Sequence, residues 1–248
     1  MYHLLWYFFL YAFLGWCMEV AYAAYAEKRF VNRGFLNGPV CPIYGVGVCI
    51  VYLLLTPLRD HWVLLFFGSL LLTTALEGLT GLVLEQIFHQ KWWDYSDKRW
   101  NWKGYICLSM SLLWGLACVV IVHTLFPATD FLIRVFPQVL GIVLLCVFGG
   151  LLTADLVTTV LVISGLQRQM KLLFELSGKI REESDKLGKQ VSKNTLELTE
   201  RYEAIAKKTH ILRRRLIQAF PTMRSVRYNE QLSELRRRIL ERERKLKK

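Results

Sequence analysis

NRGFLNGPVCPIYG, residues 32–45, separates the first two long apolar runs of the chain. It leads from a charged turn through Gly38-Pro39 and Pro42 directly into apolar sequence. Proline lacks a backbone N–H and glycine loosens the backbone, so a regular helix cannot run through the whole stretch. Irregular backbone at membrane depth is tolerated only where protein or a water-filled cavity covers it. This stretch is therefore the first candidate for a functional site, and a weaker copy occurs at residues 101–115.

The composition divides the chain into two parts. With 54% hydrophobic residues and a mean hydropathy of +0.30, its 248 residues are too apolar for an ordinary soluble domain. Residues 1–166 hold nine Lys/Arg and nine Asp/Glu, whereas residues 167–248 hold the other 23 basic and 11 acidic residues and so the whole net charge of +12. We expect a transmembrane helical domain at 1–166 and a basic, cytoplasmic helical tail at 167–248.

Five apolar runs reach the about 20 residues that a helix needs to span the hydrocarbon core. They cover roughly residues 3–26, 40–58, 62–89, 105–126 and 137–165. The sequence therefore predicts an all-α integral membrane protein with five transmembrane helices.

The distribution of Lys and Arg in the short loops predicts the orientation. The loops after the first and third runs carry seven basic residues, whereas those after the second and fourth runs carry only Arg59 and Arg134. Cytoplasmic loops are the ones enriched in Lys and Arg. We expect a multi-pass protein of the cell membrane, with the N-terminus outside and the C-terminus in the cytoplasm.

An internal repeat is visible in the first four runs. A G-x-x-x-E motif ends the first run at residues 15–19 and the third at 81–85. Each motif is followed by a charged loop and then by two glycines eleven positions apart, the first of them Gly34 in one copy and Gly104 in the other. The pattern predicts two hairpins of the same topology plus a fifth helix.

The tail has the periodicity of a helix. Apolar residues recur every seven positions at Val191, Leu198, Ile205 and Leu212, which is typical of a coiled coil. Pro221 ends this segment, and a second basic helix is expected from about residue 229.

Two arginine triplets, at 213–215 and 236–238, determine which partners the tail is expected to have. Basic cytoplasmic segments of membrane proteins commonly contact anionic headgroups. Few aromatic residues interleave with these charges, so we expect anionic lipids and not nucleic acid as partners.

Four carboxylates within the apolar runs are the candidate binding residues: Glu19, Glu77, Glu85 and Asp155. A charged Asp, Lys or Arg at the centre of a spanning helix costs about 2.5–3.5 kcal/mol, so such side chains are expected to face the bundle interior, a partner or water. Glu77 and Glu85 lie eight residues apart on one helix face. Glu19 and Glu85 lie near the ends of their runs, where they could reach Arg33. The alternative to a binding role is a buried ion pair that only fixes the packing of the helices.

Several kinds of chemistry have no motif here. The chain has no G-x-S-x-G nucleophile motif, no P-loop and no H-E-x-x-H. Its six cysteines form no C-x-x-C pair. No catalytic residue, metal site or cofactor is predicted.

The ordered motifs G-W-x-x-E at 15–19, NRGFLNGPVCPIYGVG at 32–47, WDYS at 93–96 and NWKGYICLSMSLLWG at 101–115 resemble the ABC-transporter type IV family, the CmpB-type permease-like membrane proteins of bacteria. The resemblance covers roughly residues 5–165. It implies a multi-span permease, and an ATPase would have to be a separate subunit. The motif positions are Glu19, Asn32, Arg33, Gly34, Gly38, Pro39, Pro42, Tyr44, Gly45, Trp93, Asp94, Tyr95, Ser96, Asn101, Gly104 and Trp114.

Three functions are compatible with these features, and the permease is favoured. In it, a small solute or ion would pass through a cavity open to the cytoplasm and lined by Glu19, Arg33, Glu77, Glu85 and Asp155. The alternatives are an integral membrane enzyme acting on a lipid-linked substrate, with the same carboxylates as acid and base, and a membrane scaffold that recruits a cytoplasmic partner through its tail. The sequence leaves open whether the protein is a homo-oligomer.

Overall fold

The computed structural model describes residues 1–187, 193–207 and 211–246. Helices make up 79% of the structure, and four of them are long and apolar enough to cross a membrane. These four cover Tyr2–Glu27 (α1), Trp62–Phe88 (α3), Leu108–Val135 (α4 and α5) and Gln138–Glu182 within α6. The protein is a multi-pass helical membrane protein.

The second apolar run forms a shorter helix than predicted. α2 covers Pro42–Leu55, and a 3-10 turn at Thr56–Leu58 continues it. Fourteen residues rise about 21 Å, less than the about 30 Å of the hydrocarbon core. Pro42 occupies the first turn of α2, where its missing N–H costs no hydrogen bond. Residues 28–41 ahead of it are not helical, which confirms the irregular backbone predicted there.

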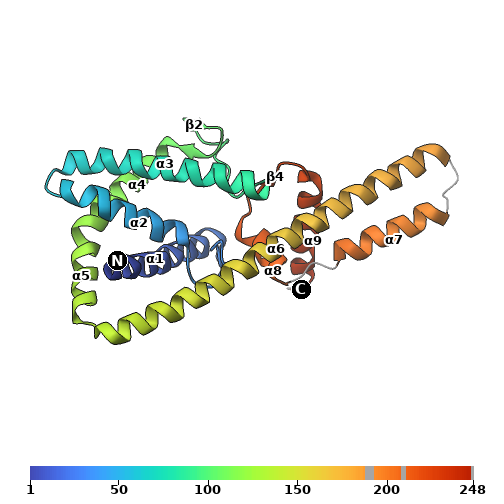
Figure 1. Ribbon diagram of the computed structural model, residues 1–248. Coiled ribbons are helices and arrows are strands. Elements are labelled where there is room, and N and C mark those ends of the chain that lie inside the picture. The colour runs from blue at the N-terminus through green and yellow to red at the C-terminus, as the bar shows by residue number, and fades with distance from the viewer. Residues whose placement is uncertain (188–192, 208–210, 247–248) are drawn as a thin grey trace.

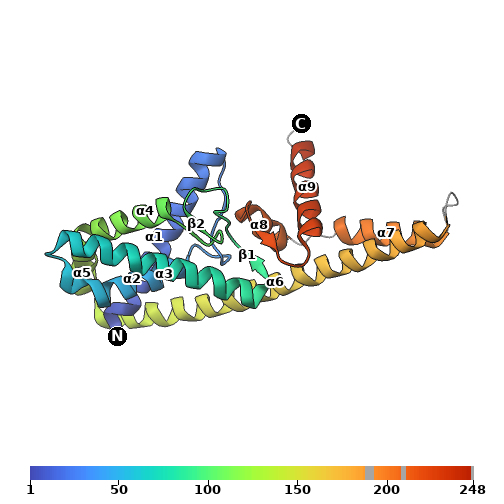
Figure 2. The same ribbon diagram turned by 90° about the horizontal axis from the view of Figure 1, so that it is seen from above.

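Helices α2, α3, α4 and α6 run between the two ends of the molecule (Figure 1). The N-terminus and α5 (Phe126–Val135) lie at one end, which we call the α5 end. The connections 28–41 and 89–107 lie at the opposite end, which we call the loop end, and the tail helices extend from it (Figure 2).

The fourth run differs in detail from the predicted span 105–126. α4 covers Leu108–Val120, a π-helical turn follows at Ile121–Leu125, and α5 continues the chain. Inserted π turns commonly kink helices, and α5 lies across the end of the bundle. It is held there by Tyr7, whose hydroxyl donates to the Phe126 carbonyl at 3.3 Å, and by Tyr11, 3.1 Å from the Thr129 hydroxyl.

α6 is a single helix from Gln138 to Leu187, so the expected domain boundary at residue 166 falls within continuous helix. α7 (Lys193–Lys207) packs back along it, and α8 (Ile211–Ala219) and α9 (Asn229–Leu246) complete the tail. Val191 of the seven-residue stripe lies outside the described residues. Ile205 from this stripe packs into the core shared with α6, so this part of the stripe is used within one chain, and a coiled coil with a second chain stays a prediction.

The tail is built onto the loop end. β1 (Gln90–Lys91) pairs antiparallel with β4 (Arg224–Ser225), while β2 (Asn101–Trp102) pairs with β3 (Ile106–Cys107). Trp92 is 2% exposed, and its ring centroid lies 5.0 Å from those of both Phe35 and Phe220. This indole therefore joins the first connection to the tail.

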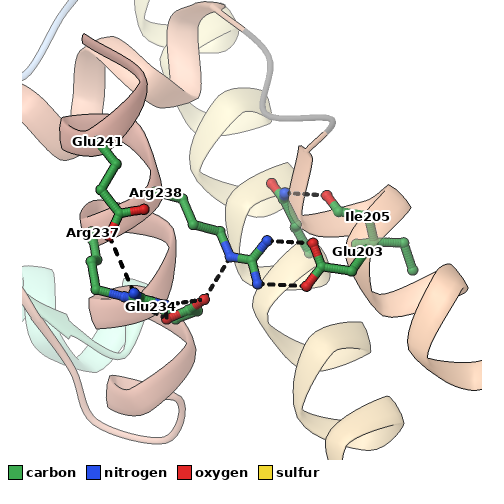
Figure 3. A network of polar contacts seen from close by, with 7 residues as sticks. Glu203, Ile205, Glu234, Arg237, Arg238 and Glu241 are labelled. Atoms are coloured by element: carbon green, nitrogen blue, oxygen red, sulfur yellow. Dashed lines mark hydrogen bonds and ion pairs between the residues drawn. The ribbon is translucent and has the colours of Figure 1, made fainter. Parts of the chain in front are cut away.

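One arginine connects the tail helices with each other (Figure 3). The guanidinium of Arg238 on α9 donates two hydrogen bonds to Glu203 on α7, at 2.7 and 2.8 Å, and one to Glu234 at 2.6 Å. The Gln169 amide on α6 donates to the Ile205 carbonyl at 2.9 Å. Bidentate pairs of this kind fix orientation as well as distance, so α6, α7 and α9 form one unit.

Candidate functional site

Glu19 forms the first of three glutamate–tyrosine pairs at the loop end. The hydroxyl of Tyr44, in the first turn of α2, donates to the Glu19 carboxylate at 2.6 Å. The Tyr44 ring packs directly on Gly15, where a Cβ atom would lie 2.4 Å from it. The G-x-x-x-E motif thus provides space for the ring and, one turn later, an acceptor for its hydroxyl.

Glu77 forms the second pair with Tyr95 of the WDYS motif. The Tyr95 hydroxyl donates to Glu77 Oε1 at 3.0 Å, whereas Glu77 Oε2 is buried and has no hydrogen-bond partner among the described residues. Burial and the nearby charge of Glu77 raise the pKa of Tyr95, so its phenol stays protonated and remains a donor.

The hairpins α1–α2 and α3–α4 contact each other beside the first pair. The charge of Glu19 also contributes to the raised pKa of Tyr95, which places both carboxylates within electrostatic range of one phenol. The Tyr44 ring contacts Trp114 of α4 with a centroid distance of 5.6 Å. Tyr44 and Trp114 hold corresponding places in the predicted repeat, so the two copies touch at the site.

Glu85 forms the third pair, at the edge of the molecule. The Tyr105 hydroxyl donates to it at 2.7 Å, and a Cβ at Gly81 would lie 2.9 Å from the Tyr105 ring. Lys91 Nζ lies 4.0 Å from this carboxylate and 4.6 Å from the centroid of the Tyr105 ring. Burial and the hydrogen bond to Glu85 raise the pKa of Tyr105 to about 12.

Asp155 lies apart from the glutamates and holds the first connection. Its carboxylate accepts hydrogen bonds from the Asn37 N–H at 3.1 Å, the Asn37 side-chain amide at 2.8 Å and the Gly38 N–H at 2.7 Å. A carboxylate with three donors is well satisfied in an apolar setting. The sequence identified Asp155 as a site residue but did not show that Asn37 and Gly38 are its partners.

Arg215 is the residue that sequence reasoning missed. Its guanidinium donates to the Gly34, Leu36 and Phe35 carbonyls at 3.1, 2.8 and 3.3 Å. Burial lowers its pKa, although the charge of Asp155 opposes this shift. Arg33 makes no ion pair among the described residues, and its guanidinium lies 5.5 Å from the Tyr22 ring centroid. The only signal for Arg215 in the sequence was the arginine triplet.

Asn32 organises the first connection. Its side-chain oxygen accepts from the Trp16 indole N–H at 2.8 Å and from the Gly34 N–H at 2.9 Å. Its amide donates to the Asn37 carbonyl at 2.8 Å. At the start of α2, a Cβ at Gly45 would lie 2.5 Å from a backbone oxygen of α1, so the two helices pack closely there.

Asn101 has the corresponding role in the second connection. Its amide donates to the Lys98 carbonyl at 2.7 Å, and its oxygen accepts from the Gly104 N–H at 3.2 Å. Gly104 has φ +76°, and a Cβ there would lie 2.3 Å from Asp94, so glycine is required. Asp94 accepts from the N–H and hydroxyl of Ser96 and forms an ion pair with Arg224 at 3.1 Å.

The structure thus divides the predicted site residues into three groups. Glu19 and Glu77 both act on the phenol of Tyr95, Glu85 lies at the edge with Lys91, and Asp155 holds the first connection. Among the side chains described, no three His, Cys, Asp or Glu groups come together as a metal site would require.

The family model described as "Putative ABC-transporter type IV" matches residues 6–160, which include both hairpins and most of the apolar part of α6. This match confirms the resemblance inferred from the motifs. No curated protein and no solved structure matches the chain.

Proposed function

Because the chain belongs to the ABC-transporter type IV family, we propose that it is a permease that moves a small cation or protons through the seam between its two hairpins. One observation carries the proposal: Glu19 and Glu77 are each held by a tyrosine hydroxyl, and the charges of both act on the phenol of Tyr95. Ionisable groups within membrane spans typically mark ion paths and proton relays.

The chemistry of the pairs fits this role. Glu77 Oε2 is buried and accepts no hydrogen bond from the residues that the structure describes, so it can take a proton, an ammonium group or a cation. A tyrosine hydroxyl both donates and accepts hydrogen bonds, so Tyr95 and Tyr44 can pass a proton or orient a carboxylate. Glu85 with Lys91 at the loop end would form the cytoplasmic mouth of the path.

We propose five crossings, with the N-terminus outside and the loop end in the cytoplasm. The short α2 crosses together with residues 35–41, whose irregular backbone is covered by Asp155 and Arg215, as membrane burial requires. In a variant without native cysteines, a membrane-impermeant thiol reagent added outside intact cells should label a cysteine at Asp60 and not one at Asp97. The reverse labelling would contradict this topology.

The decisive experiment substitutes Glu77. Wild type and Glu77→Gln would be reconstituted in proteoliposomes, and fluxes of protons, Na⁺, K⁺ and Mg²⁺ measured with internal dyes. We expect the amide variant to lose at least about tenfold of the flux, since it keeps shape but not charge, while membrane abundance stays unchanged. Glu175→Gln, on the exposed part of α6, is the control. Full flux in Glu77→Gln would contradict the carboxylate path.

A scaffold is the second candidate, favoured by the arm that α6 and α7 form beyond the membrane part (Figure 1). From residue 166 to residue 187, α6 rises about 32 Å, long enough to present a surface to a cytoplasmic partner such as a separate ATPase. A variant with a shortened arm separates the two functions. Retained flux in the variant with the shortened arm supports the permease. Loss of function in that variant, together with normal function of Glu77→Gln, supports the scaffold.

A further inference from the structure

A basic cavity lies at the loop end, away from the glutamate–tyrosine pairs. Its volume is about 510 Å³, and it is enclosed by the end of α3, by α6 and by the turn between β4 and α9. The polar and charged residues that line it include His89, Ser164, Arg168, Lys171, Arg227 and Tyr228.

The charges in this cavity are unbalanced. The lining includes three exposed basic residues, Arg168, Lys171 and Arg227, and one carboxylate, Glu175, which lies 3.8 Å from Lys171 Nζ. Arg168 and Arg227 have no ion-pair partner within residues 1–187, 193–207 and 211–246. The cavity therefore holds two uncompensated guanidinium groups beside serine and tyrosine hydroxyls.

The cavity lies at the depth in the bilayer at which lipid headgroups are expected. Arg168 is thirty residues beyond Gln138, so it lies about 45 Å along α6 from the α5 end. A bilayer including its headgroup regions is about 40–45 Å thick. Trp100 and Trp102, exposed at the same end, are of the type that anchors in this interface.

We propose that this cavity binds the phosphate group of an anionic lipid such as phosphatidylglycerol. Guanidinium groups bind phosphate oxygens through paired, charge-assisted hydrogen bonds, and basic pockets between helices on the cytoplasmic side are suited to anionic headgroups. Arg168 belongs to α6 and Arg227 to the β4–α9 turn, so a bound lipid fastens the tail to the membrane part. The proposal does not depend on the permease function.

Native mass spectrometry of the full-length protein in detergent tests this site, with phosphatidylglycerol, phosphatidylcholine and inorganic phosphate as probes. Wild type should bind phosphatidylglycerol in preference to phosphatidylcholine. The double variant Arg168→Ala/Arg227→Ala should bind it about 30-fold more weakly, since each basic residue near an anionic surface is worth about fivefold. Arg168→Lys/Arg227→Lys, which keeps the charge but not the planar fork of donors, should bind more weakly than wild type and more tightly than the alanine variant, and it shows that the fold tolerates changes at both positions.

The matched control is Lys179→Ala/Arg181→Ala, which removes the same charge from an exposed part of α6 beyond the cavity. Binding equal to wild type supports the site. Equal losses in the two alanine variants, or no loss in Arg168→Ala/Arg227→Ala, would overturn it. Displacement of the lipid by inorganic phosphate at equal concentration would overturn the lipid assignment in favour of a soluble phosphate.

Discussion

Residues 28–41 and 89–107 connect corresponding helices of the two hairpins, yet different parts of the chain support them. Asp155 and Arg215, both distant in sequence, hold the first connection. The second forms the β2–β3 pair and a hydrogen bond from the Tyr95 N–H to the Gly104 carbonyl at 2.9 Å within itself, and it meets the tail through the β1–β4 pair and the Asp94–Arg224 ion pair. Residues 89–107 number 19 and residues 28–41 number 14, so the second connection has five more residues with which to fold locally.

The difference indicates how the tail is coupled to the membrane part. A short connection with Gly and Pro cannot satisfy its own backbone groups. Its N–H groups therefore donate to the carboxylate of Asp155, and its carbonyls accept from the guanidinium of Arg215. Perturbing Asp155 or Arg215 should therefore loosen the first connection and leave the second intact.

The largest effect is expected for Asp155→Ala. The substitution leaves the N–H groups of Asn37 and Gly38 without their acceptor, while the Asn37 side-chain amide keeps its hydrogen bond to Thr159, and it should lower the free energy of unfolding by about 3 kcal/mol. Thermal unfolding in detergent measures the loss, and hydrogen exchange should increase in residues 34–40. Thr158→Ala is the control, because this exposed hydroxyl bonds only within its own helix. Unchanged stability and protection in Asp155→Ala would show that the carboxylate does not hold the connection.

Arg215→Ala should follow, with a loss of about 2 kcal/mol, because three carbonyls lose a charged donor. Lysine should not restore stability fully, since it lacks the planar fork of donors. Amide exchange in residues 34–38 should accelerate about 30-fold if it occurs by local opening, while residues 101–107 keep wild-type rates. Arg201→Ala removes an exposed arginine on α7 and serves as control. Equal acceleration in both connections would remove the distinction between them.

The sequence predicted the parts of the fold that depend on local composition. Apolar runs identified the long helices, and Gly38-Pro39 with Pro42 identified irregular backbone before α2. The predicted span at 137–165 and the predicted helical tail form one continuous helix, α6, because no proline lies between residues 138 and 187.

Contacts between distant segments were beyond the sequence. A side chain that bonds to a distant backbone group, as Arg215 does to the Leu36 carbonyl, leaves no periodic pattern in the sequence. A run of three arginines also does not show which one is buried. The candidate carboxylates were found because charges in apolar runs are costly. Their tyrosine partners were not assigned, because Tyr95 and Tyr105 reach α3 from a connection whose fold depends on tertiary contacts.

The second connection should show its own weakness at low pH, through Asp94. Burial alone would raise the pKa of Asp94, but hydrogen bonds from Ser96 and the charge of Arg224 outweigh it and keep this pKa below the ordinary value. A carboxyl with a lowered pKa stabilises the folded state above its unfolded pKa of about 3.9, and this contribution is lost as the pH falls through the folded value. The protection factors of residues 94–104, which are the intrinsic exchange rates divided by the observed rates at each pH, should therefore fall below about pH 4, with residues 34–40 less affected.

Asp94→Asn tests the origin of that transition. The amide cannot titrate, so the variant should show faster exchange in residues 94–104 at neutral pH and no further change in their protection factors between pH 5 and pH 3. Asp97→Asn, at an exposed position three residues on, should behave like wild type. A transition that persists unchanged in Asp94→Asn would assign it to another group.

The smallest effects compare the glutamate–tyrosine pairs of the two hairpins. Tyr44→Phe keeps the ring on Gly15 but removes the 2.6 Å hydrogen bond to Glu19, which should cost about 1–1.5 kcal/mol. Tyr105→Phe removes a bond of similar length, but Glu85 keeps Lys91 at 4.0 Å, so about 0.5 kcal/mol is expected. Thermal unfolding of both variants under the same conditions measures the difference. If Tyr105→Phe lost more stability than Tyr44→Phe, the second hairpin would depend more on its glutamate–tyrosine pair than the first hairpin does.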